Sequence, residues 1–102
     1  MSNEPYEPQR YAGLSRQEIL SRVRDAGWDP APIDDPGGYV YPPHQHTAAK
    51  LLAILSGSMA VTIDGQTYQC APGDQVVIPG GVVHAAVVGP EGCTFYWSEQ
   101  IR

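Results

Sequence analysis

The segment from Gly38 to Gly57 restricts the structure of this chain more than any other. It alternates like a β-strand and carries two histidines, His44 and His46, that are separated by one residue. Because residues i and i+2 of a strand point to the same face, both imidazoles are expected on one side. Two imidazoles on one face can serve as ligands of a single metal ion. The last of the three histidines, His84, lies in a second segment marked by glycine and proline.

The composition favours a single all-β domain. The chain has 102 residues, of which 42% are hydrophobic and 17% are charged, a balance typical of one globular core. The 11 glycines and 10 prolines indicate many short strands joined by turns, as in a small antiparallel barrel or sandwich.

The charge and the termini restrict the partners and the compartment. A formal net charge of −5 disfavours binding to nucleic acid or to an anionic membrane surface. The polar N-terminus has no signal-peptide pattern, and no apolar run approaches the ~20 residues of a spanning helix, so a cytoplasmic location is expected. Cys70 and Cys93 are expected to be buried free thiols, with a redox or catalytic thiol near the metal as the alternative.

One helix is predicted, from Ser15 to Ala26. Ser15 and Glu18 match the capping-box pattern at its start. Ile19, Val23 and Ala26 recur on one apolar face. A short isolated helix is marginal in water, so this one is expected to dock on the rest of the chain.

The chain is expected to divide into three parts. Residues 1–13 form an irregular arm, residues 14–36 form the helix and a loop that pack on the barrel, and residues 37–102 form the barrel. Within the second part, residues 28–36 are rich in aspartate and proline and predict a solvated loop. Around residues 48–55 both strand parities are apolar, which predicts a second cover from the helix or from another subunit. The predicted strands are 38–42, 47–55, 58–63, 66–70, 75–78, 83–88 and 93–99.

The first marked segment resembles the first signature motif of the cupin superfamily. That motif reads Gly, five residues, His-x-His, three or four residues, Glu, six residues, Gly. Gly38, His44, His46 and Gly57 stand at the matching positions, and Lys50 stands where the family has its glutamate.

The second marked segment resembles the second cupin motif, which reads Gly, five residues, Pro-x-Gly, two residues, His, three residues, Asn. Gly73, Pro79, Gly81 and His84 match, and Val88 replaces the asparagine. Together the two segments cover about residues 38 to 97, and their combined spacing is far more specific than His-x-His alone.

The resemblance implies a fold and a metal site. The fold is an all-β double-stranded β-helix (jelly-roll) barrel with one N-terminal helix, usually a homodimer. The ligands carried over are His44, His46 and His84, holding a divalent transition metal. Imidazole ligands suit Zn, Fe, Ni or Cu better than Mg or Ca. The alternative is a metal-free barrel in which the same histidines are hydrogen-bonded core or rim residues, since a buried imidazole needs a partner.

Lys50 departs from the family pattern, and three arrangements are open. It is neutral beside the metal, where it acts as a base or a ligand. It turns its long side chain away and leaves an open three-histidine site, which is the arrangement we favour. Or the site holds no metal and a charged Lys50 binds an anionic ligand. A role as a rim residue with its ammonium in solvent is a further alternative.

The predicted pocket is small and mostly apolar. Lys50 and Tyr96 are the candidate catalytic residues, although the aromatic residues near the C-terminus are more typical of core. The candidate lining residues are Ile54, Met59 or Val61, Ala86, Val88, and some of Phe95, Tyr96 and Trp97, with Trp97 the preferred aromatic.

Three functions follow from these features. The first is a metal-dependent enzyme that acts on a small molecule, with oxygenase-like or isomerase-like chemistry. The second is a non-catalytic cupin that binds or senses a small ligand, with or without metal. The third is a degenerate barrel with an interaction role, which the missing glutamate and asparagine favour and the three retained histidines oppose.

Overall fold

The structure, a computed structural model, describes residues 4–100 of the chain. It confirms an all-β architecture with one helix near the N-terminus. Residues 1–3 of the expected arm and residues 101–102 of the expected barrel lie outside the described part. The elements are β1 (Tyr6–Glu7), α1 (Arg16–Asp25), β2 (Ala31–Asp35), β3 (Val40–His44), β4 (Ala49–Ile63), β5 (Gln66–Cys70), β6 (Gln75–Ile78) and β7 (His84–Gln100).

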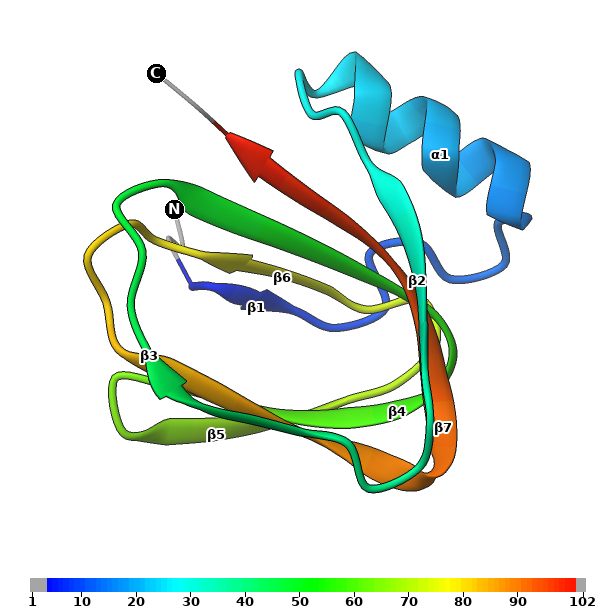
Figure 1. The fold of residues 1–102 in the computed structure, drawn as a ribbon. Coiled ribbons are helices and arrows are strands. Elements are labelled where there is room, and N and C mark those ends of the chain that lie inside the picture. The colour runs from blue at the N-terminus through cyan, green and yellow to red at the C-terminus, as the bar shows by residue number, and fades with distance from the viewer. Residues whose placement is uncertain (1–3, 101–102) are drawn as a thin grey trace.

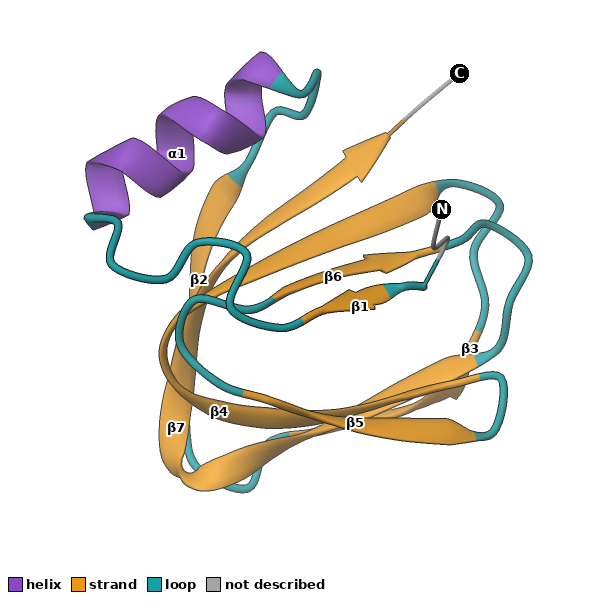
Figure 2. Ribbon diagram, turned by 180° about the vertical axis from the view of Figure 1, so that it is seen from behind, coloured by secondary structure: helices purple, strands orange, loops and turns teal. Residues whose placement is uncertain are grey.

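Two long antiparallel strands, β4 and β7, form the framework of the fold. They pair from Ala49 opposite Gln100 to Ile63 opposite His84, and both bend midway, so each runs through two facing layers (Figures 1 and 2). One layer has the order β1-β6-β4-β7-β2, while β5 joins the second half of β4 and β3 joins the first half of β7. The predicted separate strands 47–55 and 58–63 are therefore one strand, as are 83–88 and 93–99.

The bend in β4 lies at Gly57, the last residue of the first sequence motif. Gly57 has a φ of +76°, and a Cβ there would lie 2.0 Å from the carbonyl oxygen of Gly92. Only glycine fits such a close approach of two backbones. The gap between the predicted strands 47–55 and 58–63 is thus a bend within one strand, where the register between β4 and β7 shifts.

The first half of β4 is buried on both faces, as its apolar pattern predicts. Leu52 and Ile54 belong to the core between the two layers. Leu51 and Ala53 point the opposite way and pack in a second cluster with α1, to which Val23 contributes a fully buried side chain. The helix is therefore the second cover. Burying each such aliphatic side chain contributes about 1.5–3 kcal/mol.

The helix begins as its capping box predicts. The Oγ of Ser15 accepts from the amide of Glu18 at 3.1 Å, and a carboxylate oxygen of Glu18 accepts from the amide of Ser15 at 2.8 Å. Gly27, with a φ of +98°, follows the C-cap. No helix in residues 4–100 has the length and apolar character needed to span a lipid bilayer.

The structure differs from the sequence prediction between residues 28 and 36. Ala31–Asp35 is not loop but strand β2, which pairs with β7. The composition of Ala31–Asp35 does not predict a strand, because aspartate and proline are depleted in strands. A proline is tolerated on an edge strand, and β2 ends the order of its layer, where Pro32 lies opposite Tyr96.

The N-terminal arm is also more ordered than expected, because it is bound to a buried carboxylate. Tyr6–Glu7 pairs with β6, and Asp74, which is 1% exposed, accepts hydrogen bonds from the Tyr6 hydroxyl at 2.7 Å and the Gln9 amide at 2.8 Å. The amide of Ala71 donates to the same carboxylate at 2.8 Å. Burial alone would raise the pKa of Asp74, but these hydrogen bonds outweigh it and lower the pKa below its ordinary value.

We expect Asp74→Asn to lower the free energy of unfolding by about 2–3 kcal/mol at pH 7, since it leaves buried donors without a charged acceptor. The folded-state pKa is depressed, so this stabilisation is complete above the unfolded pKa of about 3.9 and is lost as pH falls through the folded pKa. Urea denaturation at pH 7 and pH 3 measures both effects. The exposed Asp25→Asn is the matched control, and an equal loss in the two variants at pH 7 would contradict the prediction.

Candidate metal centre

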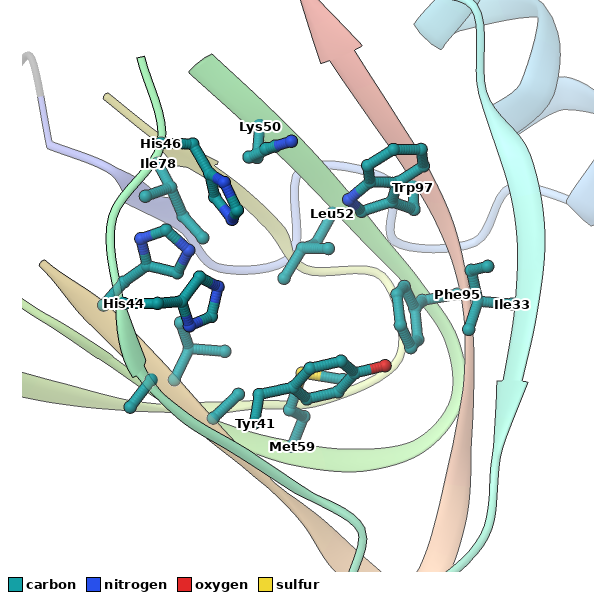
Figure 3. Close-up of a pocket in the computed structure, with 14 residues that line it drawn as sticks. Ile33, Tyr41, His44, His46, Lys50, Leu52, Met59, Ile78, Phe95 and Trp97 are labelled. Atoms are coloured by element: carbon teal, nitrogen blue, oxygen red, sulfur yellow. The ribbon is translucent and has the colours of Figure 1, made fainter. Parts of the chain in front are cut away.

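The three histidines form one cluster at the wall of the cavity between the layers, and Figure 3 labels two of them, His44 and His46. Their ring centroids are 4.7 Å apart for His44 and His46, 4.3 Å for His44 and His84, and 5.3 Å for His46 and His84. One potential ligand atom from each lies within 4.8 Å of the others. Within the cluster, His84 is buried, His44 is partly buried and His46 is exposed.

Pairing of β3 with β7 places two of the histidines, and a contact with the turn before β7 places the third. His44 ends β3 opposite His84, the first residue of β7. His46 follows β3, and its carbonyl oxygen accepts a 2.6 Å hydrogen bond from the amide of Gly81. A Cβ at Gly80 would lie 2.1 Å from the carbonyl oxygen of Thr47. The glycines of the second motif therefore allow the two histidine-bearing segments to touch.

Backbone carbonyls orient two of the imidazole rings. The Nδ1 atom of His44 lies 2.5 Å from the carbonyl oxygen of Pro42, and the Nδ1 atom of His84 lies 3.1 Å from that of Val82. A carbonyl only accepts, so each Nδ1 carries the proton and each Nε2 keeps its lone pair. This is the arrangement in which a second partner orients a metal-ligating histidine.

The electrostatic surroundings favour the neutral, ligating form of two of the rings. Desolvation lowers the pKa of His46, and the charge of Lys50 and the neighbouring histidines lower it further. Desolvation also lowers the pKa of His84, against an opposing hydrogen bond to Val82. A lowered pKa means that less proton competition opposes metal binding at neutral pH.

The donor set fits a divalent transition metal. Three imidazole nitrogens bound at about 2.0–2.1 Å from one ion lie no more than about 4.2 Å apart, and the potential ligand atoms of the three histidines lie within 4.8 Å of one another. Nitrogen ligands suit Zn, Cu, Fe or Ni. Three protein ligands leave further positions open toward the cavity.

Lys50 does not act as a fourth member of the cluster. Its side chain is almost buried, its ammonium is hydrogen-bonded to the carboxylate of Glu99, and it lies 5.1 Å from the centroid of the Trp97 ring. Figure 3 shows the amine turned toward Trp97 rather than toward the rings of His44 and His46.

The cluster opens into a cavity of about 370 Å³ with mostly apolar walls. Tyr41 brings a hydroxyl to it, but that hydroxyl donates a 2.5 Å hydrogen bond to Asp35. Burial and the Asp35 carboxylate raise the pKa of Tyr41, so the phenol stays protonated. The lining residues are Ile33, Tyr41, His44, His46, Lys50, Leu52, Met59, Val61, Ile78, His84, Ala85, Ala86, Phe95 and Trp97.

Most of the predicted pocket residues line this cavity, but three do not. Ile54 and Val88 lie deeper in the core between the layers. Tyr96, a candidate catalytic residue, points to the other face of β7 and packs in the cluster under α1. Strand parity could have separated it from Phe95 and Trp97, which alternate with it along β7.

The sequence reasoning missed other residues at the cavity. Ile33 was hidden because β2 was not recognised as a strand. Glu99 was missed although it shares the parity of Trp97, because nothing in the sequence paired it with Lys50. Tyr41, Leu52 and Ile78 lie in predicted strands. An alternating strand pattern does not distinguish a residue of the cavity wall from a residue of the core.

Comparisons with known proteins agree with the geometry. The family described as "Cupin domain" matches residues 33–99. A curated dimethylsulfoniopropionate lyase, DddW of Ruegeria pomeroyi, is 41% identical over 58 residues, which cover 57% of this chain and 38% of that protein. The chain therefore spans well under half the length of that lyase.

Solved structures share the architecture. KdgF from Halomonas sp. is 26% identical with a TM-score of 0.60, and the match covers 70% of this chain and 66% of that one. An RmlC-like cupin from Shewanella frigidimarina is 24% identical with a TM-score of 0.64, covering 74% and 68%. Bacillus subtilis oxalate decarboxylase, which has Mn(II) centres, is 24% identical with a TM-score of 0.61, covering 76% and 23%. The last two likenesses show the fold alone.

In the metal-free protein we expect the imidazoles of His46 and His84 to titrate below pH 6.5, the ordinary value, because desolvation opposes protonation. Two-dimensional ¹⁵N–¹H NMR of the histidine rings measures each midpoint and also identifies the tautomer. The same spectra should show the proton on Nδ1 in the neutral rings of His44 and His84. A midpoint for His46 at or above 6.5, or Nε2–H tautomers, would contradict the electrostatic description of the site.

Proposed function

The chain belongs to the cupin family, and on that basis we propose that it is a metal-dependent enzyme acting on a small organic molecule. His44, His46 and His84 hold a divalent transition metal, with Zn, Fe, Ni and Cu as the candidates. The observation that supports this most is the convergence of three imidazoles, two of them oriented by carbonyls, at the wall of an apolar cavity.

The chain's own residues divide the remaining tasks. The bound metal would supply Lewis acidity, polarising an oxygen atom of the ligand. Leu52, Met59 and Phe95 line the cavity with apolar surface that excludes water and strengthens electrostatic contacts inside. The hydrogen bonds that Nδ1–H of His44 and His84 donates to backbone carbonyls keep the Nε2 atoms aimed at the site.

The residues of the cavity lining that can donate or accept a proton bear on the class of reaction. Besides the histidines, Lys50 and Tyr41 are the titratable side chains in the lining. Oxygenase-like and isomerase-like chemistry are the classes we propose, with Lys50 as the assisting residue. The similarity to a lyase over part of its length adds elimination to these classes.

A non-catalytic ligand-binding cupin is the second candidate. It is favoured by the fact that both proton-exchanging side chains are already engaged, Lys50 with Glu99 and Tyr41 with Asp35. A site built this way binds and orients a small ligand without a free acid or base beside it.

We expect the purified protein, reconstituted separately with Fe(II), Ni(II), Cu(II) and Zn(II), to retain about one equivalent of at least one ion per chain. His84→Ala should lower the affinity for that ion by 100-fold or more, since removing a ligand exceeds the ~10–100-fold effect of removing its orienting partner. Elemental analysis after gel filtration and competition with a chelator provide the measurement. Gln45→Ala, an exposed neighbour of both histidines in the first motif, is the control.

The outcomes separate the two candidates. Turnover of any substrate in a panel of small organic acids, lost in His84→Ala and kept in Gln45→Ala, supports the enzyme. Metal-dependent ligand binding without turnover supports the binding cupin. Absence of stoichiometric metal in all four reconstitutions would refute the metal centre.

The two thiols support the proposed cytoplasmic location. Burial raises the pKa of Cys70 to about 12 and that of Cys93 to about 11, and both are free and buried. Such thiols are inert at neutral pH and suit a reducing compartment. Neither lines the cavity, so we do not assign them to the proposed chemistry.

We also propose that the protein is a homodimer. Val40 on β3 and Val87 on β7 lie opposite each other and are 57% and 48% exposed, and Tyr39, next to Val40 in the chain, is 45% exposed. Exposed apolar side chains grouped in this way are typical of an interaction surface.

Val87→Lys is expected to convert the dimer to a monomer, because it places a charge in the centre of that surface. Light scattering coupled to gel filtration measures the mass, and Gln69→Lys, an exposed position on β5, is the control. A wild-type protein that runs as a monomer at micromolar concentration would exclude this proposal without affecting the metal centre.

A further inference from the structure

A partly buried ion pair lies at the wall of the cavity beside the histidines. The Lys50 side chain is 9% exposed, and that of Glu99, its partner across β4 and β7, is 34% exposed. The ammonium also lies 5.1 Å from the centroid of the Trp97 ring. The two members of the pair thus differ in their access to water, and only Lys50 belongs to the cavity lining.

The difference in exposure determines which member can leave the pair. Lys50 cannot reach water without moving its side chain out of the cavity, so a charged Lys50 always needs an anionic partner. Glu99, which is one-third exposed, can turn to solvent at small cost. An ammonium has three donors, and within residues 4–100 this one has a single hydrogen-bond acceptor, Glu99.

The charges of the cavity favour an anionic occupant. The charges of Lys50 and Glu99 cancel, and no carboxylate among the described residues is part of the cavity lining. A divalent metal on neutral imidazoles would leave two uncompensated positive charges beside apolar walls. In apolar surroundings the attraction between opposite charges is strong, so these positive charges favour binding of an anionic ligand.

We propose that Lys50 is the specificity-determining residue of the cavity, and that it binds the carboxylate of a small, otherwise apolar ligand by exchanging Glu99 for that carboxylate. Glu99 is the counter-ion of the ligand-free state and competes with the ligand. The volume of about 370 Å³ lies near the lower end of small-molecule pockets, which restricts the apolar body to a short one. The metal contribution to anion binding rests on the proposed function, whereas the exchange at Lys50 does not.

If Glu99 and the ligand compete for Lys50, substitutions of Lys50 and of Glu99 have opposite effects on ligand affinity. An ion pair with only a structural role does not have this property. Removing the cation should weaken binding of a carboxylate, and removing its competitor should strengthen it. A purely structural pair would give effects of the same sign, because losing either member perturbs the same wall of the cavity. Opposite signs from Lys50→Met and Glu99→Gln therefore identify the exchange.

Trp97 provides a direct readout. The chain has two tryptophans, so Trp28→Phe leaves Trp97, next to the ammonium, as the only one. In this background, 3-methylbutanoate and its uncharged analogue 3-methylbutanamide are titrated at constant ionic strength, with the metal-free and the Zn(II)-treated protein. The fluorescence of Trp97 reports binding, and thermal unfolding followed by circular dichroism verifies that each variant is folded.

We expect the carboxylate to bind at least about 10-fold more tightly than the amide, as a charged hydrogen bond implies. Lys50→Met should abolish this preference, and Lys50→Gln serves as a second variant if the first unfolds. Glu99→Gln should increase the carboxylate affinity several-fold and leave the amide affinity unchanged. Arg10→Met is the matched control, since Arg10 also pairs with a carboxylate, Glu7, and lies 5.8 Å from the Tyr11 ring centroid, outside the cavity.

Equal binding of carboxylate and amide, or weakening in both Lys50→Met and Glu99→Gln, would overturn the inference. Failure of the protein to retain Zn(II) or any other ion refutes the proposed metal centre instead. The metal-free titrations then still decide the role of Lys50, so the two failures are distinguishable.

Discussion

The structure depends on the continuous pairing of β4 with β7. The strands have 15 and 17 residues, and a bend at Gly57 and Gly92 folds their ladder back on itself. The two ends of the ladder, with Lys50 opposite Glu99 and Ile63 opposite His84, therefore face each other across the cavity. A straight ladder of this length would place them about 40–50 Å apart.

The same pairing explains why a chain of this size can contain both a core and a cavity. The first half of β4 is buried on both faces, with α1 packed on the outside. The helix, held by Leu51 and Ala53, secures this strand from the outer side. The inner face of β4 can therefore border an open cavity near the start of the strand, where Lys50 and Leu52 line it. The strand does not depend on packing at this inner face alone, because its outer face is packed against α1.

The charged pair and the histidines obey one constraint, which is that a polar group away from water must have a partner. Carbonyl oxygens satisfy the Nδ1 atoms of His44 and His84, and Glu99 satisfies Lys50. In the described part of the chain, every buried side-chain nitrogen or oxygen has a partner. The lining thus offers a ligand the remaining imidazole nitrogens and, in the exchange that we propose, the ammonium of Lys50.

The sequence by itself determined the features that depend on local spacing. These are the capping box at Ser15 and the histidine positions whose convergence the structure confirms. Tertiary structure decided what depends on pairing between distant segments. Only the sheet shows that Asp- and Pro-rich residues 31–35 form an edge strand, that Tyr96 faces the helix, and that Glu99 lies opposite Lys50. The physical reason is that strand pairing is set by partners far away in the chain, whereas a cap, a turn or a His-x-His pair is set by residues a few positions apart.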